Sequence, residues 1–290
     1  MTVESHVEHL RKHGYVVAEQ MIPRADVEAT HVELFDNFPS PEAFAAGERG
    51  DLDASATAGT LQFPFAGDLL HRLIVHPELL RFAESAMETS DLRIYQVVLW
   101  AKYAGATDYE QALHPDYRNH TLLVPSDEPG VRQLITWILL SDVLPEHGAT
   151  RIVSRLDSGH LPPRDSYSRE DQPELYAREV AAAGPTGSVL AYGPDVLHRG
   201  AAFTAPTGGR FTLTVSFRSA EAEWAGNQSW PGMANEPQMM RFLTRCSVRE
   251  RALFGFPLPG HRYWTTAALQ GVATRYPEMD LMPYAATVSR

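Results

Sequence analysis

Apolar residues recur at helical spacing near both ends of the chain and at strand spacing in its middle. Helical periodicity, with Gly14 as a plausible C-cap of the first segment, predicts helices in the flanking regions. A short strand, Tyr15–Ala18, follows the first helix, and residues 39–60 are rich in Pro, Ala, Gly and Asp and are expected to form a surface loop. The predicted helices cover Val3–His13, Ala25–Phe38, Leu69–Met87, Gln238–Leu253 and Thr265–Thr274.

From residue 91 the pattern changes to strand-like runs separated by Pro and Gly. The predicted strands cover Leu92–Tyr103, Arg132–Val143, Thr150–Val153, Ser188–Tyr192 and Phe211–Arg218. This rhythm is typical of a β-sandwich or jelly roll. We therefore expect a mainly β protein with flanking helices. It would be a single domain over 1–290, with a helical flank over about 1–90, a jelly-roll core over about 91–220, and a C-terminal lid or helices over about 221–290.

Composition narrows the function classes. A hydrophobic content of 44% and a charged content of 21% suit a globular protein with a sizeable core. The formal net charge of −11 argues against a nucleic-acid surface, which needs a basic patch. No apolar run approaches the ~20 residues that cross a bilayer, and the polar N-terminus has no signal core. We expect a cytoplasmic protein with a small-molecule substrate; the single Cys246 is expected to be buried and inert.

A histidine and an aspartate two positions apart, His114 and Asp116, follow the predicted strand that ends at residue 103. The pattern alone is weak, because similar pairs begin at His6, His31 and His76. Those three lie in predicted helices, where residues i and i+2 do not face each other. In a strand, residues i and i+2 share a face and can reach one metal ion. We therefore expect the pair at 114 and 116 to come from one strand or strand edge.

Two further residues fit the same chemistry. His198 lies far downstream of the first pair, and Arg210 follows it by twelve positions, 210 − 198. Two imidazoles and one carboxylate can hold a ferrous ion and leave positions open for substrate and oxygen. A guanidinium can bind a carboxylate co-substrate through two parallel hydrogen bonds. Together these residues indicate an iron-dependent oxygenase.

Three blocks of the sequence resemble the phytanoyl-CoA dioxygenase family of Fe(II)/2-oxoglutarate oxygenases. The blocks are LHPD at 113–116, TWILLSDVLPEHGATRIV at 136–153 and GSVLAYGPDVLHRGAAFTAPTGGRFTLTVSF at 187–217. The resemblance implies a double-stranded β-helix core. It also implies that His114, Asp116 and His198 hold Fe(II), with 2-oxoglutarate and O2 as co-substrates.

The resemblance also implies a co-substrate site. Arg210 would bind the distal carboxylate of 2-oxoglutarate, assisted by Thr212 on the same strand face. Trp137 lies where relatives place an aromatic residue beside the co-substrate, and Lys102 matches a lysine that precedes the metal motif in many relatives. Both have simpler interpretations, as a core tryptophan and a surface lysine. Family halogenases replace the carboxylate ligand with a small residue, so Asp116 disfavours chlorination.

The expected reaction is oxidation of a small organic substrate, by default hydroxylation, with release of succinate and CO2. Desaturation, epoxidation or ring formation would use the same iron. Phe203, Trp224, Trp230 and Met233 could form a covering loop, or could pack against the end of the barrel. Asp195 could orient an imidazole, or could be an exposed turn residue.

Two other function classes remain open on the residues alone. A non-enzymatic β-sandwich that binds a small ligand explains the strand rhythm and needs neither iron nor Arg210. A zinc hydrolase could use the same three ligands, because zinc also accepts two histidines and a carboxylate with an open position. The hydrolase leaves Arg210 without a role and finds no nearby general base.

Overall fold

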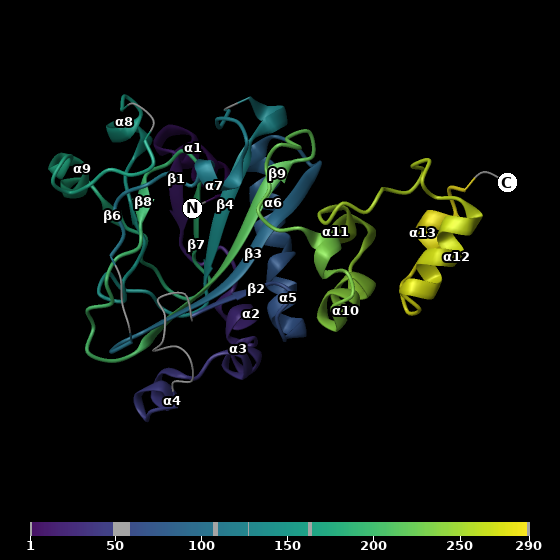
Figure 1. Ribbon diagram of the computed structural model, residues 1–290, viewed down its shortest axis with the longest axis horizontal. Helices are drawn as coiled ribbons and strands as arrows, with labels where there is room; N and C mark the ends of the chain where they lie inside the picture. Colours follow the sequence, from purple (N-terminus) through teal and green to yellow (C-terminus); the bar gives the residue numbers. More distant parts are fainter. Residues whose placement is uncertain (1, 49–58, 107–109, 127, 162–163, 289–290) are drawn as a thin grey trace.

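The computed structural model describes residues 2–48, 59–106, 110–126, 128–161 and 164–288. Within them, two antiparallel sheets lie against each other (Figure 1). The large sheet has the order β1 (Tyr15–Ala18), β7 (Val189–Tyr192), β4 (Gln133–Leu139), β9 (Gly209–Ser219), β3 (Leu92–Tyr103) and β2 (Thr60–Gln62). The small sheet has the order β6 (Val180–Ala181), β5 (Arg151–Ile152) and β8 (His198–Arg199). The expectation of a mainly β protein with flanking helices is confirmed.

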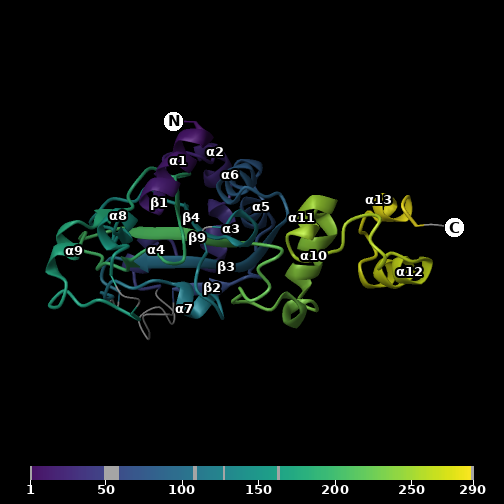
Figure 2. The ribbon, with the colours of Figure 1, turned by 90° about the horizontal axis from the view of Figure 1, so that it is seen from above.

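Helices flank the sheets on several sides (Figures 1 and 2). The N-terminal helices are α1 (Val3–His13), α2 (Arg24–Glu28), α3 (His31–Asn37), α4 (Pro41–Ala45), α5 (Asp68–Ile74) and α6 (Pro77–Met87). The loops between strands carry α7 (Tyr117–His120), η2 (Pro129–Val131), α8 (Arg155–Ser158) and α9 (Pro173–Ala177). After β9 come η3 (Trp230–Met233), α10 (Pro237–Arg245), α11 (Val248–Ala252), α12 (Thr266–Arg275) and α13 (Met282–Ala285). Figure 2 shows α12 and α13 standing away from the sheets.

The two faces of the large sheet differ in character because side chains alternate along each strand. On the outer face, Leu99 and Leu213 are opposite each other and join the main apolar core with residues of α5 and α6. On the inner face, Lys102 is opposite Arg210, and Trp100 is opposite Thr212. The outer face therefore packs against the helices, and the inner face carries charged and polar side chains that can bind a ligand.

Two of the predicted long helices are each divided in two. The predicted helix 25–38 consists of α2 and α3, and the predicted helix 69–87 consists of α5 and α6. The second break falls at Pro77, which cannot donate a backbone hydrogen bond and so begins a helix rather than continuing one. The His76 side chain caps the new helix by accepting from the Glu78 amide at 3.2 Å. The apolar spacing continues across the whole predicted segment, but the backbone forms two helices, the second of which begins at Pro77.

The predicted helix 238–253 also divides, here between α10 and α11. Ser247 caps α11, accepting from the Glu250 amide while the Glu250 carboxylate accepts from the Ser247 amide at 2.7 Å. This reciprocal capping box fixes the start of α11. Cys246, just before it, is buried as expected, and burial raises the pKa of its thiol to about 12.

The expectation of a loop over 39–60 is wrong at both ends, while residues 49–58 lie outside the described residues. Ser40 caps α4, whose first residue is Pro41. The helix forms because Phe44 is buried and stacks on Tyr103, with ring centroids 4.1 Å apart. At the other end, Thr60 begins β2.

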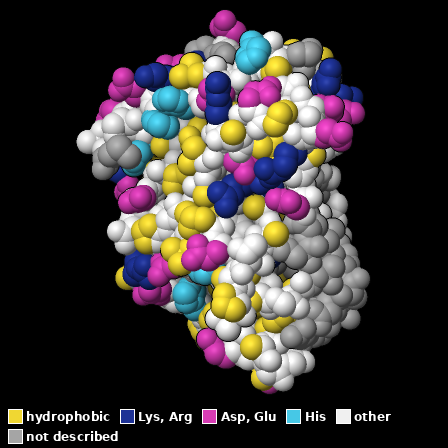
Figure 3. Space-filling view, turned by 90° about the vertical axis from the view of Figure 1, so that its left-hand side faces the viewer, with side chains coloured by type: hydrophobic (Ala, Val, Ile, Leu, Met, Phe, Trp, Pro, Cys, Tyr) yellow, Lys and Arg dark blue, Asp and Glu magenta, His cyan; other side chains and the backbone are white. Residues whose placement is uncertain are grey.

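The surface of the small-sheet side is mixed in charge. Figure 3 shows Lys and Arg side chains on this side next to Asp and Glu side chains, with histidines among them. One ion pair on this side joins Arg178 to Asp157, with the nitrogen and oxygen 2.7 Å apart. Among the helices in the described part of the chain, none is long and apolar enough to cross a bilayer.

The capping box gives a first prediction. Ser247→Ala removes the side-chain acceptor at the start of α11, which should lower the free energy of unfolding by about 1 kcal/mol. Chemical denaturation would measure the loss. Ser247→Thr keeps the hydroxyl and should stay close to the wild type; an equal loss in both variants would contradict a capping role.

Candidate metal centre

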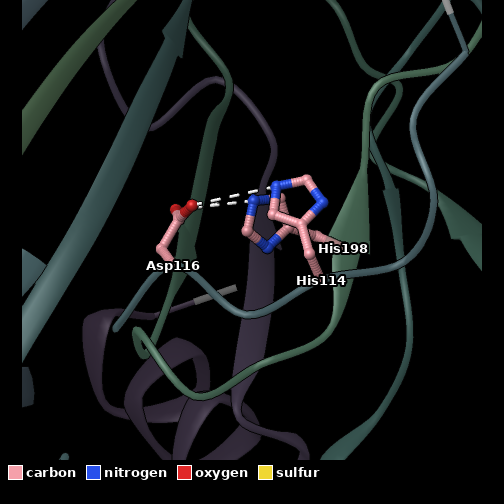
Figure 4. Close-up of side chains that lie close together, drawn as sticks. All are labelled: His114, Asp116 and His198. Carbon is pink, nitrogen blue, oxygen red and sulfur yellow. Dashed lines mark ion pairs between the residues drawn. The ribbon is translucent and has the colours of Figure 1, made fainter. Parts of the chain in front are cut away.

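Two histidines meet because their backbones pair. His114 and His198 exchange two backbone hydrogen bonds, N–H to O at 3.0 Å and 3.1 Å, as directly opposite residues of an antiparallel pair. Opposite residues in such a pair place their side chains on the same face. The two imidazole centroids lie 4.7 Å apart (Figure 4). A pairing between distant segments therefore brings together side chains that lie far apart in the sequence.

Asp116 is not part of this backbone pairing, although its carboxylate lies beside the two imidazoles. Its backbone is helical, with φ −81° and ψ −20°, and it is the N-cap of α7. The expectation that His114 and Asp116 share a strand is therefore wrong for Asp116. The chain turns through Pro115, which cannot donate to a ladder, and this turn directs the carboxylate back toward the imidazoles.

The three side chains form a compact group. Asp116 Oδ1 lies 4.0 Å from His114 Nε2, and Asp116 Oδ2 lies 3.4 Å from His198 Nε2. One ligand atom from each residue falls within 4.8 Å of the others (Figure 4). Two imidazole nitrogens and a carboxylate oxygen are a donor set that suits a divalent transition metal such as Fe(II). The residues present therefore fit a metal ion.

Backbone carbonyls determine which nitrogen of each imidazole faces the centre. His114 Nδ1 lies 2.8 Å from the Ala112 carbonyl, and His198 Nδ1 lies 3.0 Å from the Val196 carbonyl. Because a carbonyl oxygen only accepts, both Nδ1 atoms must carry the proton. When the imidazoles are neutral, as a metal ion requires, both Nε2 atoms have a lone pair directed at the centre.

The charges of the group favour a bound cation. Burial acts to raise the pKa of Asp116, but the adjacent His198 imidazole outweighs it, and the net pKa is lowered. Burial acts to lower the pKa of His198, but Asp116 outweighs it, and that net pKa is raised. Burial lowers the pKa of His114, which keeps its imidazole neutral. The carboxylate is therefore ionised, and it is the negative charge of the site.

Tyr192 belongs to the site, although it was not among the residues predicted from the sequence. It is fully buried at the end of β7, and its hydroxyl donates to Asp116 Oδ2 at 3.0 Å. The Trp137 indole N–H donates to the same hydroxyl at 3.2 Å. Since an indole N–H only donates, it directs the tyrosine proton toward the carboxylate. The signal in the sequence was an inward-facing tyrosine at the end of a predicted strand, just before Gly193.

The residues expected to bind the co-substrate lie together on the inner face. Arg210 is the second residue of β9, lies opposite Lys102 and donates to the Gly148 carbonyl. The Lys102 ammonium donates to the Ala201 carbonyl at 2.5 Å. Thr212 is only 3% exposed, and its hydroxyl has no hydrogen-bond partner in the described part of the chain. A buried hydroxyl without a partner is costly, so this one indicates a ligand that supplies the missing hydrogen bond.

Trp137 occupies the inner face rather than the outer core. It lies opposite Thr214 of β9, and its ring lies 5.2 Å from that of Trp100. The Trp100 indole N–H donates to the Thr214 hydroxyl at 2.9 Å. In the strand register, the tryptophan pair therefore lies next to Arg210 on the side toward Tyr192 and the metal-binding group.

Asp195 orients an arginine and not an imidazole. Its two carboxylate oxygens accept from Arg155 Nε and Arg155 Nη2, each at 2.9 Å. This two-pronged pair fixes the turn that leads to His198 against α8. Of the two interpretations given for Asp195, orienting an imidazole or lying exposed in a turn, neither describes this ion pair, which leaves the carboxylate about one-third exposed.

Phe203 and Trp230, for which both a covering loop and packing against the end of the barrel were open, each pack against neighbouring rings. Phe203 stacks on His147, with parallel rings 5.4 Å apart. The Trp230 indole donates to the Ile94 carbonyl at 2.8 Å, and its ring lies 5.3 Å from that of Phe254. Trp230 therefore packs with the helices that follow β9.

A family model described as Phytanoyl-CoA dioxygenase (PhyH) matches residues 10–210. The chain belongs to this family. The match begins in α1 and ends at Arg210, so it spans the metal-binding group, while α10 to α13 lie beyond it. The class predicted from the sequence, an oxygenase that uses Fe(II), 2-oxoglutarate and O2, is confirmed.

Several solved structures share the fold. The epimerase SnoN in complex with Fe3+, alpha ketoglutarate and nogalamycin RO has a TM-score of 0.57 at 18% identity, over 81% of this chain and 90% of SnoN. The carbocyclase SnoK from nogalamycin biosynthesis has a TM-score of 0.56 at 20% identity, over 76% of this chain and 87% of SnoK. AviO1 from Streptomyces viridochromogenes Tue57 has a TM-score of 0.51 at 18% identity, over 77% of this chain and 98% of AviO1. These similarities confirm the jelly-roll fold. No curated protein matches the chain.

The hydroxyl of Tyr192 gives a second prediction. Tyr192→Phe leaves Asp116 Oδ2 without its donor, so the carboxylate is less well oriented and metal affinity should fall by about tenfold or more. Anaerobic calorimetry with Mn(II) would measure the change. Tyr103→Phe is the matched control, because its hydroxyl donates to the Pro39 carbonyl instead. Unchanged affinity in Tyr192→Phe would show that the hydrogen bond does not position the carboxylate.

Proposed function

We propose that this chain is an Fe(II)- and 2-oxoglutarate-dependent dioxygenase that hydroxylates a small organic substrate. In this proposal His114, Asp116 and His198 hold the iron. The observation that carries it is the compact group of two Nε2 lone pairs and one ionised carboxylate. Three protein ligands from one side leave other positions of the metal open for co-substrate and oxygen.

Arg210 supplies the second half of the proposal. It would bind the distal carboxylate of 2-oxoglutarate, and the unsatisfied Thr212 hydroxyl would donate to the same carboxylate. Lys102, directly opposite Arg210, adds a second positive charge at this end of the sheet. A zinc hydrolase would leave this pair of cations and the Thr212 hydroxyl without a role.

The protein residues bind, orient and shield. When bound, iron and 2-oxoglutarate supply oxygen activation coupled to decarboxylation of the co-substrate to succinate and CO2. Tyr192 holds one carboxylate oxygen of Asp116 in place, and Trp137 holds Tyr192. The apolar packing of Ile135 and Leu190 against the small sheet restricts water between the sheets. A dry pocket protects the protein from the oxidant that the reaction generates.

The metal and co-substrate sites can be tested together. Anaerobic addition of Fe(II) and 2-oxoglutarate should give the weak visible charge-transfer band of the metal–keto acid chelate. His114→Ala should lose the band, because it removes one imidazole ligand. A wild-type protein that binds Fe(II) and 2-oxoglutarate without the band would contradict the proposal.

Arg210 can be tested separately from iron. Arg210→Ala should weaken 2-oxoglutarate binding by about ten- to a hundredfold, since a charged hydrogen bond contributes about 1.5–3 kcal/mol. Fe(II) affinity should not change. The matched control is Arg218→Ala, near the other end of the same strand, which should bind 2-oxoglutarate like the wild type. Equal losses in both variants would remove the specific role of Arg210.

A further inference from the structure

A buried tyrosine and a buried histidine form a hydrogen-bonded pair beside the metal-binding group. The Tyr95 hydroxyl lies 3.0 Å from Nδ1 of His120, and the two residues are only 3% and 6% exposed. His120 is the last residue of α7, whose N-cap is the candidate ligand Asp116. Side chains four positions apart lie on the same side of a helical turn. This tyrosine–histidine pair therefore faces the same region as the Asp116 carboxylate.

Electrostatic effects confirm that the pair is close to the carboxylate. Burial raises the pKa of Tyr95, and the charge of Asp116 raises it further. Burial lowers the pKa of His120, while Asp116 acts in the opposite direction. In return, His120 acts to lower the pKa of Asp116. The pair and the metal-binding group are therefore parts of one buried polar region.

A β-bulge in β3 shapes this part of the inner face. Ile94 is opposite Phe217 and Gln96 is opposite Ser216, so Tyr95 is an extra residue between them. Ile94 belongs to the main core, and alternation from it turns Tyr95 to the inner face. The bulge lets Gln96 share that face, where its amide oxygen accepts from the Ser216 hydroxyl at 3.0 Å. Two consecutive polar side chains therefore point into the space between the sheets.

The strand register places the bulge level with the metal centre. Tyr192, whose hydroxyl contacts the carboxylate ligand, is paired with Ile135, and Ile135 is paired with Ser216 beside the bulge. Arg210 is six residues from Ser216 along β9, 216 − 210, which is about 20 Å at the rise of a strand. The tyrosine–histidine pair is therefore well away from the proposed co-substrate clamp.

The segment that follows β9 holds both members of the pair in place. The Gln228 amide donates to the Tyr95 carbonyl, and the Gly226 amide donates to the His120 carbonyl, each at 3.0 Å. The Gln228 side chain also accepts from the Val97 amide of β3 at 2.8 Å. A group that is fixed before a ligand arrives loses less conformational entropy on binding. The pair is therefore preorganised.

One nitrogen of the His120 imidazole is open to a ligand. Nδ1 is occupied by the Tyr95 hydroxyl, whereas Nε2 has no hydrogen-bond partner among the described residues and is not fully enclosed by them. A neutral imidazole donates through one nitrogen and accepts through the other, and a hydroxyl can do either. Nε2 can therefore donate to a ligand or accept from it, while the tyrosine proton adjusts.

The polar side chains around the pair carry no charge. Gln96 and Ser216 are hydrogen-bonded to each other, and the Gln133 side chain donates to the His120 carbonyl at 3.4 Å. Arg218, the next inner-face residue along β9, donates to two backbone carbonyls at the end of the strand. A buried charge without an opposite charge is costly, whereas a neutral group needs only hydrogen bonds. The surroundings of the pair therefore suit a neutral ligand group.

We propose that the tyrosine–histidine pair binds an uncharged oxygen of the primary substrate, a hydroxyl or a carbonyl, through Nε2 of His120. Tyr95 is a positioning residue, because it orients the imidazole. This inference rests on the proposed function, since it concerns the substrate of the same centre. A substrate carboxylate or phosphate in this place would lie near the ionised Asp116 without a cation to balance it. The substrate class is therefore a neutral alcohol or carbonyl compound.

Three probes that share one aromatic ring test the choice of group: benzyl alcohol, toluene and benzoate. Their affinities would be measured by saturation-transfer NMR with Zn(II) and excess 2-oxoglutarate, which keep the metal and co-substrate sites filled. Benzyl alcohol should bind about three- to tenfold more tightly than toluene, the effect of one neutral hydrogen bond, and more tightly than benzoate. Equal affinities for the alcohol and toluene, or tighter binding of benzoate, would overturn the proposal.

Substitutions within the pair separate hydrogen bonding from structural damage. His120→Phe keeps a ring and removes Nε2, so the alcohol should lose its advantage over toluene. His120→Gln keeps an amide near that position and should restore part of it. Tyr95→Phe should reduce the advantage, whereas Tyr103→Phe, on the outer face of the same strand, should retain it. An equal loss for alcohol and toluene in His120→Phe would mean a structural role and overturn the proposal.

Proximity to the metal centre has its own readout. With Mn(II) and 2-oxoglutarate bound, proton relaxation of benzyl alcohol should be faster in wild-type protein than in His114→Ala. No enhancement in wild-type protein, while calorimetry shows Mn(II) bound, would overturn the proposal. The alcohol–toluene comparison is repeated without metal or co-substrate, and the Fe(II) chelate band is measured without a probe. A missing band with an intact alcohol preference would count against the proposed function alone, and a normal band without the preference against this inference alone.

Discussion

The backbone pairing of His114 with His198 is the constraint on which the site depends. Two hydrogen bonds between distant segments place two imidazoles side by side, and carbonyls close to each ring fix which nitrogen faces inward. The carboxylate of Asp116 completes the group, and the nearby His198 lowers its pKa and so favours its ionised form. The isolated pairing of these two residues thus creates a candidate site for a divalent cation.

The two faces of the large sheet have different roles: the outer face packs in the apolar core, and the inner face carries the polar groups of the candidate site. The outer face is apolar and is covered by the N-terminal helices, which share the main core with the strands and with α10. That burial offsets the cost of an inner face carrying Arg210, Thr212 and Thr214, which would be unfavourable in a core without partners. Hydrogen bonds from Trp100 to Thr214, and from Trp137 through Tyr192 to Asp116, satisfy part of this polar surface. The Thr212 hydroxyl has no partner among the described residues, which leaves it available to a ligand.

Several features of the fold follow from local patterns in the sequence. The strands β3 and β9 were visible as long alternating runs, because one face of each is buried against helices. The helix breaks at Pro77 and Ser247 were less visible, since apolar spacing continues across them while the backbone does not. The candidate ligands were also accessible, because of the four histidine–carboxylate pairs only the one at His114 lies outside the predicted helices.

The sequence by itself determined the residue types of the site and the alternating pattern that builds the sheets. Only the tertiary structure decided how they meet. Asp116 joins the imidazoles through a turn and not through strand alternation. Tyr192 becomes a partner of Asp116 because the segment after β7 meets the start of α7, where the Tyr117 amide donates to the Pro194 carbonyl at 2.9 Å. Asp195 binds Arg155 because α8 packs against the turn before His198. Periodicity reports which face of an element is buried, but hydrogen bonds between segments far apart in sequence depend on how the sheets fold over each other.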